Sequence, residues 1–405
     1  MPPPPPDNDT IAYISGETGD EIHLVDPGGS GDRIVWQNED PDGSYEVSAL
    51  AWKPDGTELA FSSSHENFCS INDVDIFAID SGGGGYRRVT EAPACDGLSA
   101  FPAGTVRIPL VGPLIDSFTG FVYFQGAPSV RPVSLAAGAS GEVVFDGVAD
   151  LGDSILQLAT VIDGNGREFA VGTAVDVLPG GTVTTAPLSL VFPELSSEAR
   201  SPNWTADGSG LGYAYGFNAL FRIDARPRPI DFGAAAVPSE AVAANIVLHM
   251  AFGPTAATAD QILFQGTQAG ISEGIYLATA GDPTPAEQLF TSEQSFYYVK
   301  GLAWLPDGSG FVYSVVEGEI LAEGSSNLFV YDLASGETTR ITDLEAEYAG
   351  LLTVSGDGRR ICFERADEID PLDGQLVEPD LWIVGVDGAG LRLLVEGARA
   401  PAWSR

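Results

Sequence analysis

The sequence predicts an all-β chain built from a repeated four-strand unit, and three observations lead to this prediction. A marker residue returns at positions 52, 204, 252, 304, 354 and 403, in most copies followed by a turn containing Asp-Gly. The runs between turns are short and rich in Val, Ile, Tyr and Phe, as is typical of strands. No stretch keeps an apolar period of 3.6 residues over three turns, so we expect no long helix.

Tryptophan occupies most of the marker positions. In chain order the markers are Trp52, Trp204, Phe252, Trp304, Val354 and Trp403. Neighbouring markers lie about 50 residues apart, a period that indicates a propeller or another array of repeated units. The first two are instead separated by one period plus about a hundred residues, which predicts an inserted domain. We expect the marker side chains to pack between units rather than to line a ligand channel.

The copy around Trp304 shows what one unit contains. Its four apolar runs lie at 301–304, 310–315, 327–332 and 339–342. Four strands per unit is the content of a propeller blade. Residues 9–38 hold only three such runs, whereas residues 400–404 form a marker strand with no partners after it. Joining these two incomplete parts into one blade would close the ring without open strand edges and would give six blades.

The repeated segments resemble those of a known family. Residues 49–61 (ALAWKPDGTELAF) and 302–313 (LAWLPDGSGFVY) are similar to the repeat of TolB-like six-bladed propellers. The resemblance covers the chain apart from the insertion and the first few positions. It implies a closed propeller and an exported protein that binds partners at the cell envelope, although the same repeat also occurs in the propeller halves of peptidases.

We expect four segments along the chain. They are a Pro-rich flexible tether at 1–8, blades 1 and 2 at 9–96, an inserted β-sandwich domain at 97–194, and blades 3 to 6 plus the closing strand of blade 1 at 195–405. Within the insertion, residues 141–148 (GEVVFDGV) resemble part of a prealbumin-like or carboxypeptidase-regulatory-like sandwich. About ninety residues suffice for a two-sheet sandwich with its own core.

The charge of the chain limits its partners. With 57 acidic and 19 basic residues the formal net charge is −38. Such a field repels phosphate backbones and anionic membranes, which argues against nucleic-acid binding. No apolar run reaches eighteen residues, so we expect no membrane span. We interpret the proline run after Met1 as the remainder of a tether in a periplasmic or extracellular protein whose N-terminal signal was removed.

The three cysteines fit an exported protein. Cys69 follows the second strand of its blade and Cys95 follows the last strand of the same blade, so we expect a disulfide between them. Cys362 lies within an apolar run, and we expect it to be a buried small side chain.

Long acidic loops suggest where a partner binds. In an up-and-down blade the loop from the second to the third strand and the link to the next blade emerge on one face. Here those loops are long and acidic, at 62–73, 316–326 and 364–379. Loops carry function more often than the scaffold does. The candidate binding residues on this face are Glu319, Glu323, Asp367, Asp370, Asp373 and Glu378.

Two function classes remain after the catalytic motifs are checked. The only histidines are His23, His65 and His249, and no GxSxG nucleophile elbow occurs. We therefore expect a non-catalytic binding or scaffold propeller without a cofactor, with a protein or a surface glycan as its partner. The alternative is a calcium-assisted hydrolase or lyase with carboxylates at the channel mouth, for which the run from Asp370 to Gly374 offers oxygen ligands without matching the twelve-residue calcium loop.

Overall fold

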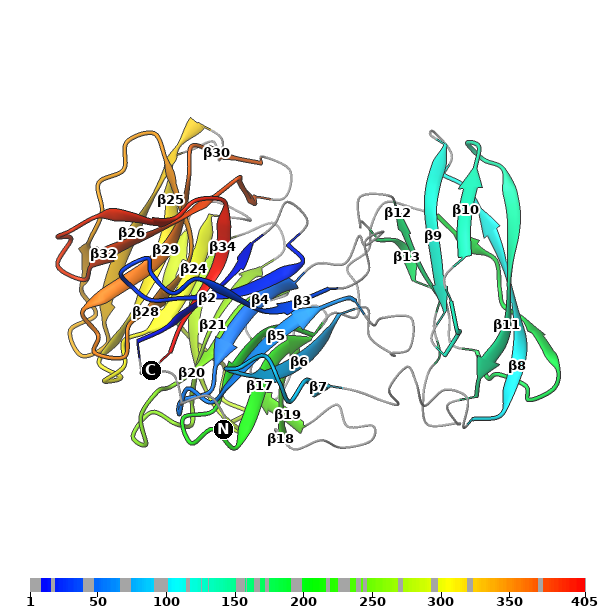
Figure 1. Ribbon diagram of the computed structural model, residues 1–405, viewed down its shortest axis with the longest axis horizontal. Coiled ribbons are helices and arrows are strands. Elements are labelled where there is room, and N and C mark those ends of the chain that lie inside the picture. Colours follow the sequence, from blue (N-terminus) through cyan, green and yellow to red (C-terminus); the bar gives the residue numbers. More distant parts are fainter. Residues whose placement is uncertain are drawn as a thin grey trace.

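The computed structural model covers the chain, and its description applies to the following residues: 9–15, 19–38, 47–65, 74–90, 101–113, 117–124, 126–129, 131–150, 157, 159–163, 168–171, 175–190, 199–215, 219–224, 234–237, 242, 246–268, 272–292, 298–318, 323–370 and 374–404. These residues form strands joined by turns and loops (Figure 1). Within them, no helix has the length and apolar character needed to cross a membrane.

Six four-stranded antiparallel sheets of the described residues form the blades of the propeller, and the first three are named blades 1 to 3 here. Blade 1 contains β34 (Ala398–Trp403), β1 (Ile11–Ser15), β2 (Glu21–Val25) and β3 (Arg33–Gln37). Blade 2 contains β4 (Val47–Trp52), β5 (Glu58–Ser63), β6 (Asp75–Asp80) and β7 (Arg87–Arg88). Blade 3 contains β16 (Ala199–Trp204), β17 (Gly210–Tyr215), β18 (Ala219–Asp224) and β19 (Ala234–Val237).

Blades 4 to 6 repeat this pattern. Blade 4 contains β20 (Ile246–Phe252), β21 (Gln261–Gln268), β22 (Ser272–Thr279) and β23 (Glu287–Ser292). Blade 5 contains β24 (Val299–Trp304), β25 (Gly310–Glu317), β26 (Ser325–Asp332) and β27 (Thr338–Arg340). Blade 6 contains β28 (Tyr348–Val354), β29 (Arg360–Ala366), β32 (Asp380–Gly385) and β33 (Arg392–Val395), with the hairpin β30 (Glu368–Ile369) and β31 (Leu376–Val377) inserted between β29 and β32.

The Asp-Gly turn after each marker strand has a local cause. In blade 5, Asp307 Oδ1 accepts hydrogen bonds from the Ser309 backbone N–H at 2.9 Å and from the Ser309 hydroxyl at 2.7 Å. Gly308 has a φ of 74°, a left-handed conformation that glycine adopts without steric cost. The turn therefore reverses the chain directly after the marker strand and sets β25 beside β24.

The chain termini close the ring, as the sequence predicts. Strand β1 pairs antiparallel with β34, and Ile11 lies opposite Trp403. Beyond the strands, Trp403 Nε1 donates to Asp9 Oδ1 at 2.9 Å, and Arg360 pairs with the same carboxylate while stacking on the Trp403 ring. The end of the chain is thus bonded both to blade 1 and to the neighbouring blade 6.

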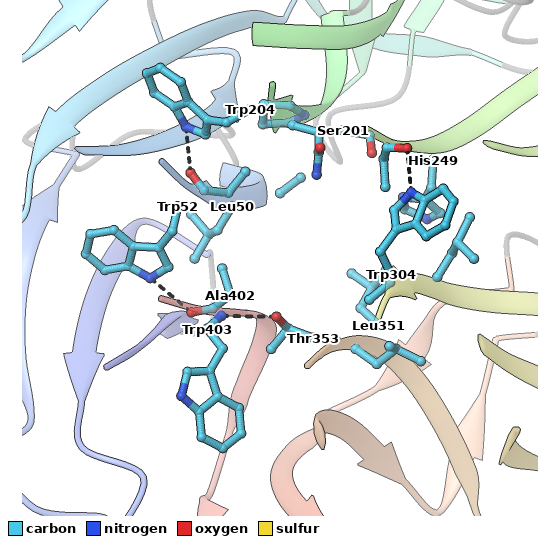
Figure 2. Close-up of a pocket in the computed structure, with 18 of the residues that line it drawn as sticks. Leu50, Trp52, Ser201, Trp204, His249, Trp304, Leu351, Thr353, Ala402 and Trp403 are labelled. Carbon is cyan, nitrogen blue, oxygen red and sulfur yellow. Dashed lines mark hydrogen bonds between the residues drawn. The ribbon is translucent and has the colours of Figure 1, made fainter. Parts of the chain in front are cut away.

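The first strands of the six blades surround one axis. Each contacts the next in the order β4, β16, β20, β24, β28 and β34, and β34 returns to β4. The marker side chains at their ends are between 0% and 8% exposed. Three indoles donate to the preceding first strand: Trp52 Nε1 to Ala402 O, Trp204 Nε1 to Ala51 O, and Trp304 Nε1 to Ala251 O, each at 3.0–3.1 Å (Figure 2). The markers therefore join blades as well as fill the core.

Where the marker is not tryptophan, other side chains make the link. Phe252 has no indole donor, and its backbone N–H donates instead to Asn203 Oδ1 of blade 3 at 2.9 Å. Between blades 5 and 6, where the marker is Val354, Ser314 Oγ donates to Gly350 O at 2.8 Å. The repeat thus keeps a polar connection between these blades although the marker changes.

The strands β8 to β15 form two further sheets that stand apart from the blades (Figure 1). One sheet has the order β10 (Arg131–Leu135), β9 (Phe118–Phe124), β12 (Ala159–Asp163), β13 (Glu168–Val171). The other has β11 (Ser140–Ala149), β8 (Ala103–Val111), β14 (Thr182–Thr184), with β15 (Leu188–Ser189) also paired to β8. Their buried side chains form one apolar cluster drawn only from residues 106–190. We propose that this pair of sheets is the core of an inserted domain spanning 97–194.

Candidate binding face

Two ends of the propeller differ in their connections. We call the end where second-to-third loops and links between blades emerge the long-loop face, and the opposite end, with the Asp-Gly turns, the turn face. In Figure 1 the hairpin strand β30 lies at the upper edge and the C-terminus at the lower edge. In blades 5 and 6 the described residues of the long-loop face are 318, 323–324, 341–347, 367–370 and 374–379.

The structure places four of the six candidate binding residues. Glu323, Asp367 and Glu378 are exposed, and Asp370 is half-buried. Glu378 has a φ of 46°, a conformation that is rare outside glycine. Glu319 and Asp373 lie outside the part of the chain that the structure describes. Glu323, Asp367 and Glu378 therefore belong to one exposed face of two adjacent blades.

Some acidic side chains of this face are neutralised and others are not. Glu317 pairs with Arg340, and Glu347 pairs with Arg365. By contrast, no ion pair within the described ranges involves the exposed carboxylate of Glu378 or a further group of four exposed carboxylates. These four, which we call the unpaired acidic set, are Glu323, Glu345, Asp367 and Glu368. The set gives this face a local excess of negative charge.

Glu345 was not among the residues expected from the sequence. It lies in the link from blade 5 to blade 6, whereas the sequence interpretation concentrated on the loops within blades. The signal was present, because the links between blades emerge on the same face as the loops from the second to the third strand.

The hairpin β30–β31 is fixed onto the neighbouring blade. Ile369 is 5% exposed and packs, together with Leu376, into the apolar cluster of blade 5. Lys300 of β24 donates from Nζ to Gly374 O. The hairpin turn is closed by Gly374 N–H to Asp370 O at 2.8 Å. Asp367 and Glu368 therefore lie on an anchored element, which reduces the entropy lost when a partner orders them.

Two buried carboxylates support the first strands beneath this face. Glu364, 6% exposed, accepts the Ala400 N–H at 2.7 Å and the Leu351 N–H at 2.9 Å. Glu273, fully buried, accepts the Val299 N–H at 2.7 Å and a hydrogen bond from Gln265 at 2.8 Å. Burial raises the pKa of both carboxyl groups above the ordinary value of 4.5. Each one joins adjacent blades, because Ala400 and Val299 belong to the next blade in the ring.

The sequence interpretation assigned Glu364 to a surface loop, and the structure does not agree. Strand β29 extends to Ala366, so Glu364 lies inside the strand and points into the ring. The register offers a signal that was missed. The corresponding position in the second strand of other blades carries Ser62, Gln265 and Ser314, all polar and all buried. At this repeated place Gln265 donates to Val299 O at 2.7 Å and Ser314 donates to Gly350 O at 2.8 Å, both in the next blade. Ser62 Oγ, by contrast, has no hydrogen-bond partner among the described residues.

The histidines have separate environments. His23 lies between Glu21 at 3.0 Å and Asp32 at 3.1 Å in blade 1. His65 contacts the Ser63 and Tyr86 hydroxyls at 2.8 and 2.7 Å in blade 2. Among the described residues, no group of three His, Cys, Asp or Glu side chains is placed to hold a metal ion.

The cysteine prediction can be tested by counting thiols. Cys362 is fully buried, and burial raises its pKa, whereas Cys69 and Cys95 lie outside the described residues. We expect no rapid reaction of the native protein with a thiol reagent at neutral pH, because a buried thiol is unreactive and the other two are joined. Unfolding should release one thiol, and unfolding with a reductant should release three. Three thiols without reductant would exclude the disulfide.

A cavity of about 140 Å³ lies on the axis at the level of the marker residues. All six first strands contribute to its wall (Figure 2). It is bounded by residues of the marker strands and by Pro54, Ala206 and Pro254, which follow those strands on the turn face. It is therefore separate from the acidic long-loop face.

Solved structures show the same fold in other proteins. TolB from Acinetobacter baumannii matches with a TM-score of 0.50 and 13% identity, over 98% of this chain and 66% of the TolB chain. A chain of a nidogen/laminin complex matches with a TM-score of 0.52 and 7% identity, over 98% of both chains. No protein-family model matches the sequence, and a search of curated proteins gave no match. The chain thus has a β-propeller fold like that of TolB.

Proposed function

We propose that this protein is a non-catalytic, exported binding propeller. It engages a partner through the long-loop face of blades 5 and 6, with the inserted sandwich as a second contact. The observation that carries the proposal is the unpaired acidic set, Glu323, Glu345, Asp367 and Glu368, exposed on one face of a rigid ring. The sequence resemblance to TolB-like propellers supports a binding role. The similarity to solved structures supports the fold alone.

The charge of this face favours one kind of partner. Exposed carboxylates steer a positively charged surface toward the face and raise its association rate. A protein with a basic patch fits this chemistry better than a neutral glycan, which gains nothing from the field. We therefore place a basic protein surface first and a surface glycan second.

The alternative, a calcium-assisted hydrolase or lyase, receives less support. It requires several free carboxylates that converge on one point. The two carboxylates buried near the axis, Glu273 and Glu364, each already accept hydrogen bonds at both oxygens. The exposed acidic side chains come from three different loops of the face. The arrangement suits a broad contact better than a reaction centre.

We further propose that the protein works in the periplasm or outside the cell, with the Pro-rich residues 1–8 as a flexible tether. The proposal rests on the family resemblance and on the extended conformation that proline runs adopt. The net charge of −38 fits a position away from anionic membrane surfaces.

Site-specific photo-crosslinking in the native cell tests the binding face. A photoreactive residue at Asp367 or Glu345 should give one defined adduct with a partner protein. The same residue at Glu337, exposed in the β26–β27 turn on the turn face, is the matched control and should give none. Adducts of equal yield at all three positions, or none from the long-loop positions, would contradict the proposal.

A further inference from the structure

The axial cavity differs in chemistry from the rest of the molecule. In a chain with 57 acidic and 19 basic residues, the residues that line this cavity include no Asp, Glu, Lys or Arg. Its polar side chains are Ser201, Asn203, His249 and Thr353. The remainder of the wall is aliphatic, proline, tryptophan or the thioether of Met250. A ligand of this cavity would therefore be recognised by neutral hydrogen bonds.

Three of these polar side chains have their oxygen atoms in use. Ser201 Oγ accepts the Met250 N–H at 3.2 Å, and Asn203 Oδ1 accepts the Phe252 N–H at 2.9 Å. Thr353 Oγ1 accepts the Trp403 N–H at 3.1 Å. When the oxygen of a hydroxyl or an amide accepts an N–H, the hydroxyl hydrogen or the amide NH2 group can still donate to another acceptor. For Ser201, Asn203 and Thr353, no acceptor for these hydrogens is found within the described residues.

These donors lie on opposite sides of the cavity. Ser201 and Asn203 are on β16, and Thr353 is on β28. In the ring of six first strands, β28 is three positions from β16 in both directions. Figure 2 shows Ser201 and Thr353 on opposite sides of the central opening. Ser201 also has a φ of 52° at a bulge in β16. Ala400, at the equivalent bulge of β34, has a φ of 49°, so this conformation belongs to the repeated geometry of the first strands and does not by itself mark a binding site.

We propose that the axial cavity binds a small neutral polyol, or the polyol end of a larger molecule. Its hydroxyl oxygens would accept hydrogen bonds from Ser201, Asn203 and Thr353. The size agrees, because an apolar cavity of about 150 Å³ holds a ligand of six non-hydrogen atoms. The large negative charge of the protein disfavours an anionic ligand with the same acceptor atoms. This site is separate from the long-loop face and does not depend on the binding role proposed above.

Saturation-transfer difference NMR on the full chain tests this site, with glycerol as the probe and acetate as an anionic control of similar size. We expect saturation transfer to glycerol and none to acetate. Absence of transfer to glycerol, or equal transfer to acetate, would overturn the proposal whatever the variants show.

Two variants locate the binding. Asn203→Asp keeps the acceptor for the Phe252 N–H but removes the NH2 donors, so the Kd for glycerol should rise at least about fivefold. Thr338→Val, on the exposed outer strand β27, controls for surface effects, and circular dichroism checks folding. An unchanged Kd in folded Asn203→Asp would overturn the assignment to this cavity.

Discussion

A chain that ends at Gly397 is expected to lose its cooperative unfolding transition. The truncation removes β34, the strand that completes blade 1 and separates β28 from β4 around the axis. Loss of a buried tryptophan alone costs about 3–5 kcal/mol, and Trp403 is 3% exposed. Whole proteins are stable by only about 5–15 kcal/mol. The truncation also leaves the edge of β1 unpaired and open to aggregation.

Thermal unfolding followed by near-ultraviolet circular dichroism checks this expectation. A chain that begins at Asp9 is the control, because it keeps every described strand as well as the bond from Trp403 to Asp9. It should melt as the full chain does. If the chain ending at Gly397 melted cooperatively within a few degrees of the full chain, β34 would not be needed for closure.

Glu364→Ala is expected to lower the free energy of unfolding by about 2–6 kcal/mol. The substitution leaves two buried N–H groups, of Leu351 and Ala400, without an acceptor, and each such group costs about 1–3 kcal/mol. Glu368→Ala is the matched control, since that side chain is exposed and unpaired, and it should change stability by less than about 0.5 kcal/mol. Urea unfolding of both variants measures the difference. Equal stabilities would show that Glu364 does not hold the blades together.

The same carboxyl group gives a pH dependence with a defined sign. Burial holds the folded-state pKa of Glu364 above 4.5, so the folded protein binds this proton more tightly than the unfolded chain does. The stability that Glu364 contributes is complete below pH 4.5 and is lost as pH rises through the folded-state pKa. Glu364→Gln does not titrate, so the stability difference between the unmodified protein and this variant should shrink as pH rises from 4.5. If the difference instead grew over this range, the hydrogen bonds to the Glu364 carboxylate would lower its folded-state pKa more than burial raises it.

The repeat allowed much of the fold to be predicted from the sequence. Local patterns predicted the marker positions and the Asp-Gly turns. They also predicted that three strands at the start of the chain share a blade with one strand at its end, and β1 does pair with β34. Such features depend on residues close together in the chain. The period of the markers also indicated where an extra segment interrupts the propeller, although its extent as a domain stays a prediction.

Contacts between blades were harder to predict. The role of Glu364 depends on the N–H groups of Leu351 and Ala400, which become neighbours only when the ring closes. Asn203 Oδ1 accepts the backbone N–H of Phe252, which has no indole to donate, and this link is visible only when two repeats are placed side by side. The sequence interpretation placed Asp367 on a long loop, where it is exposed, but it did not include Glu345 of the short link. The binding role of these acidic residues stays a prediction.

The affinity of the crosslinked partner for a charge-neutralised variant tests the binding role most directly. Replacing three of the unpaired acidic set (Glu323→Gln, Asp367→Asn and Glu368→Gln) should weaken binding about tenfold at physiological salt, if each exposed charge contributes about 0.2–1 kcal/mol. The control removes three charges from the turn-face side, Asp260→Asn, Glu287→Gln and Glu337→Gln, and should bind as the unmodified protein does. Unchanged affinity in the first variant, or an equal loss in both, would contradict recognition through the long-loop face.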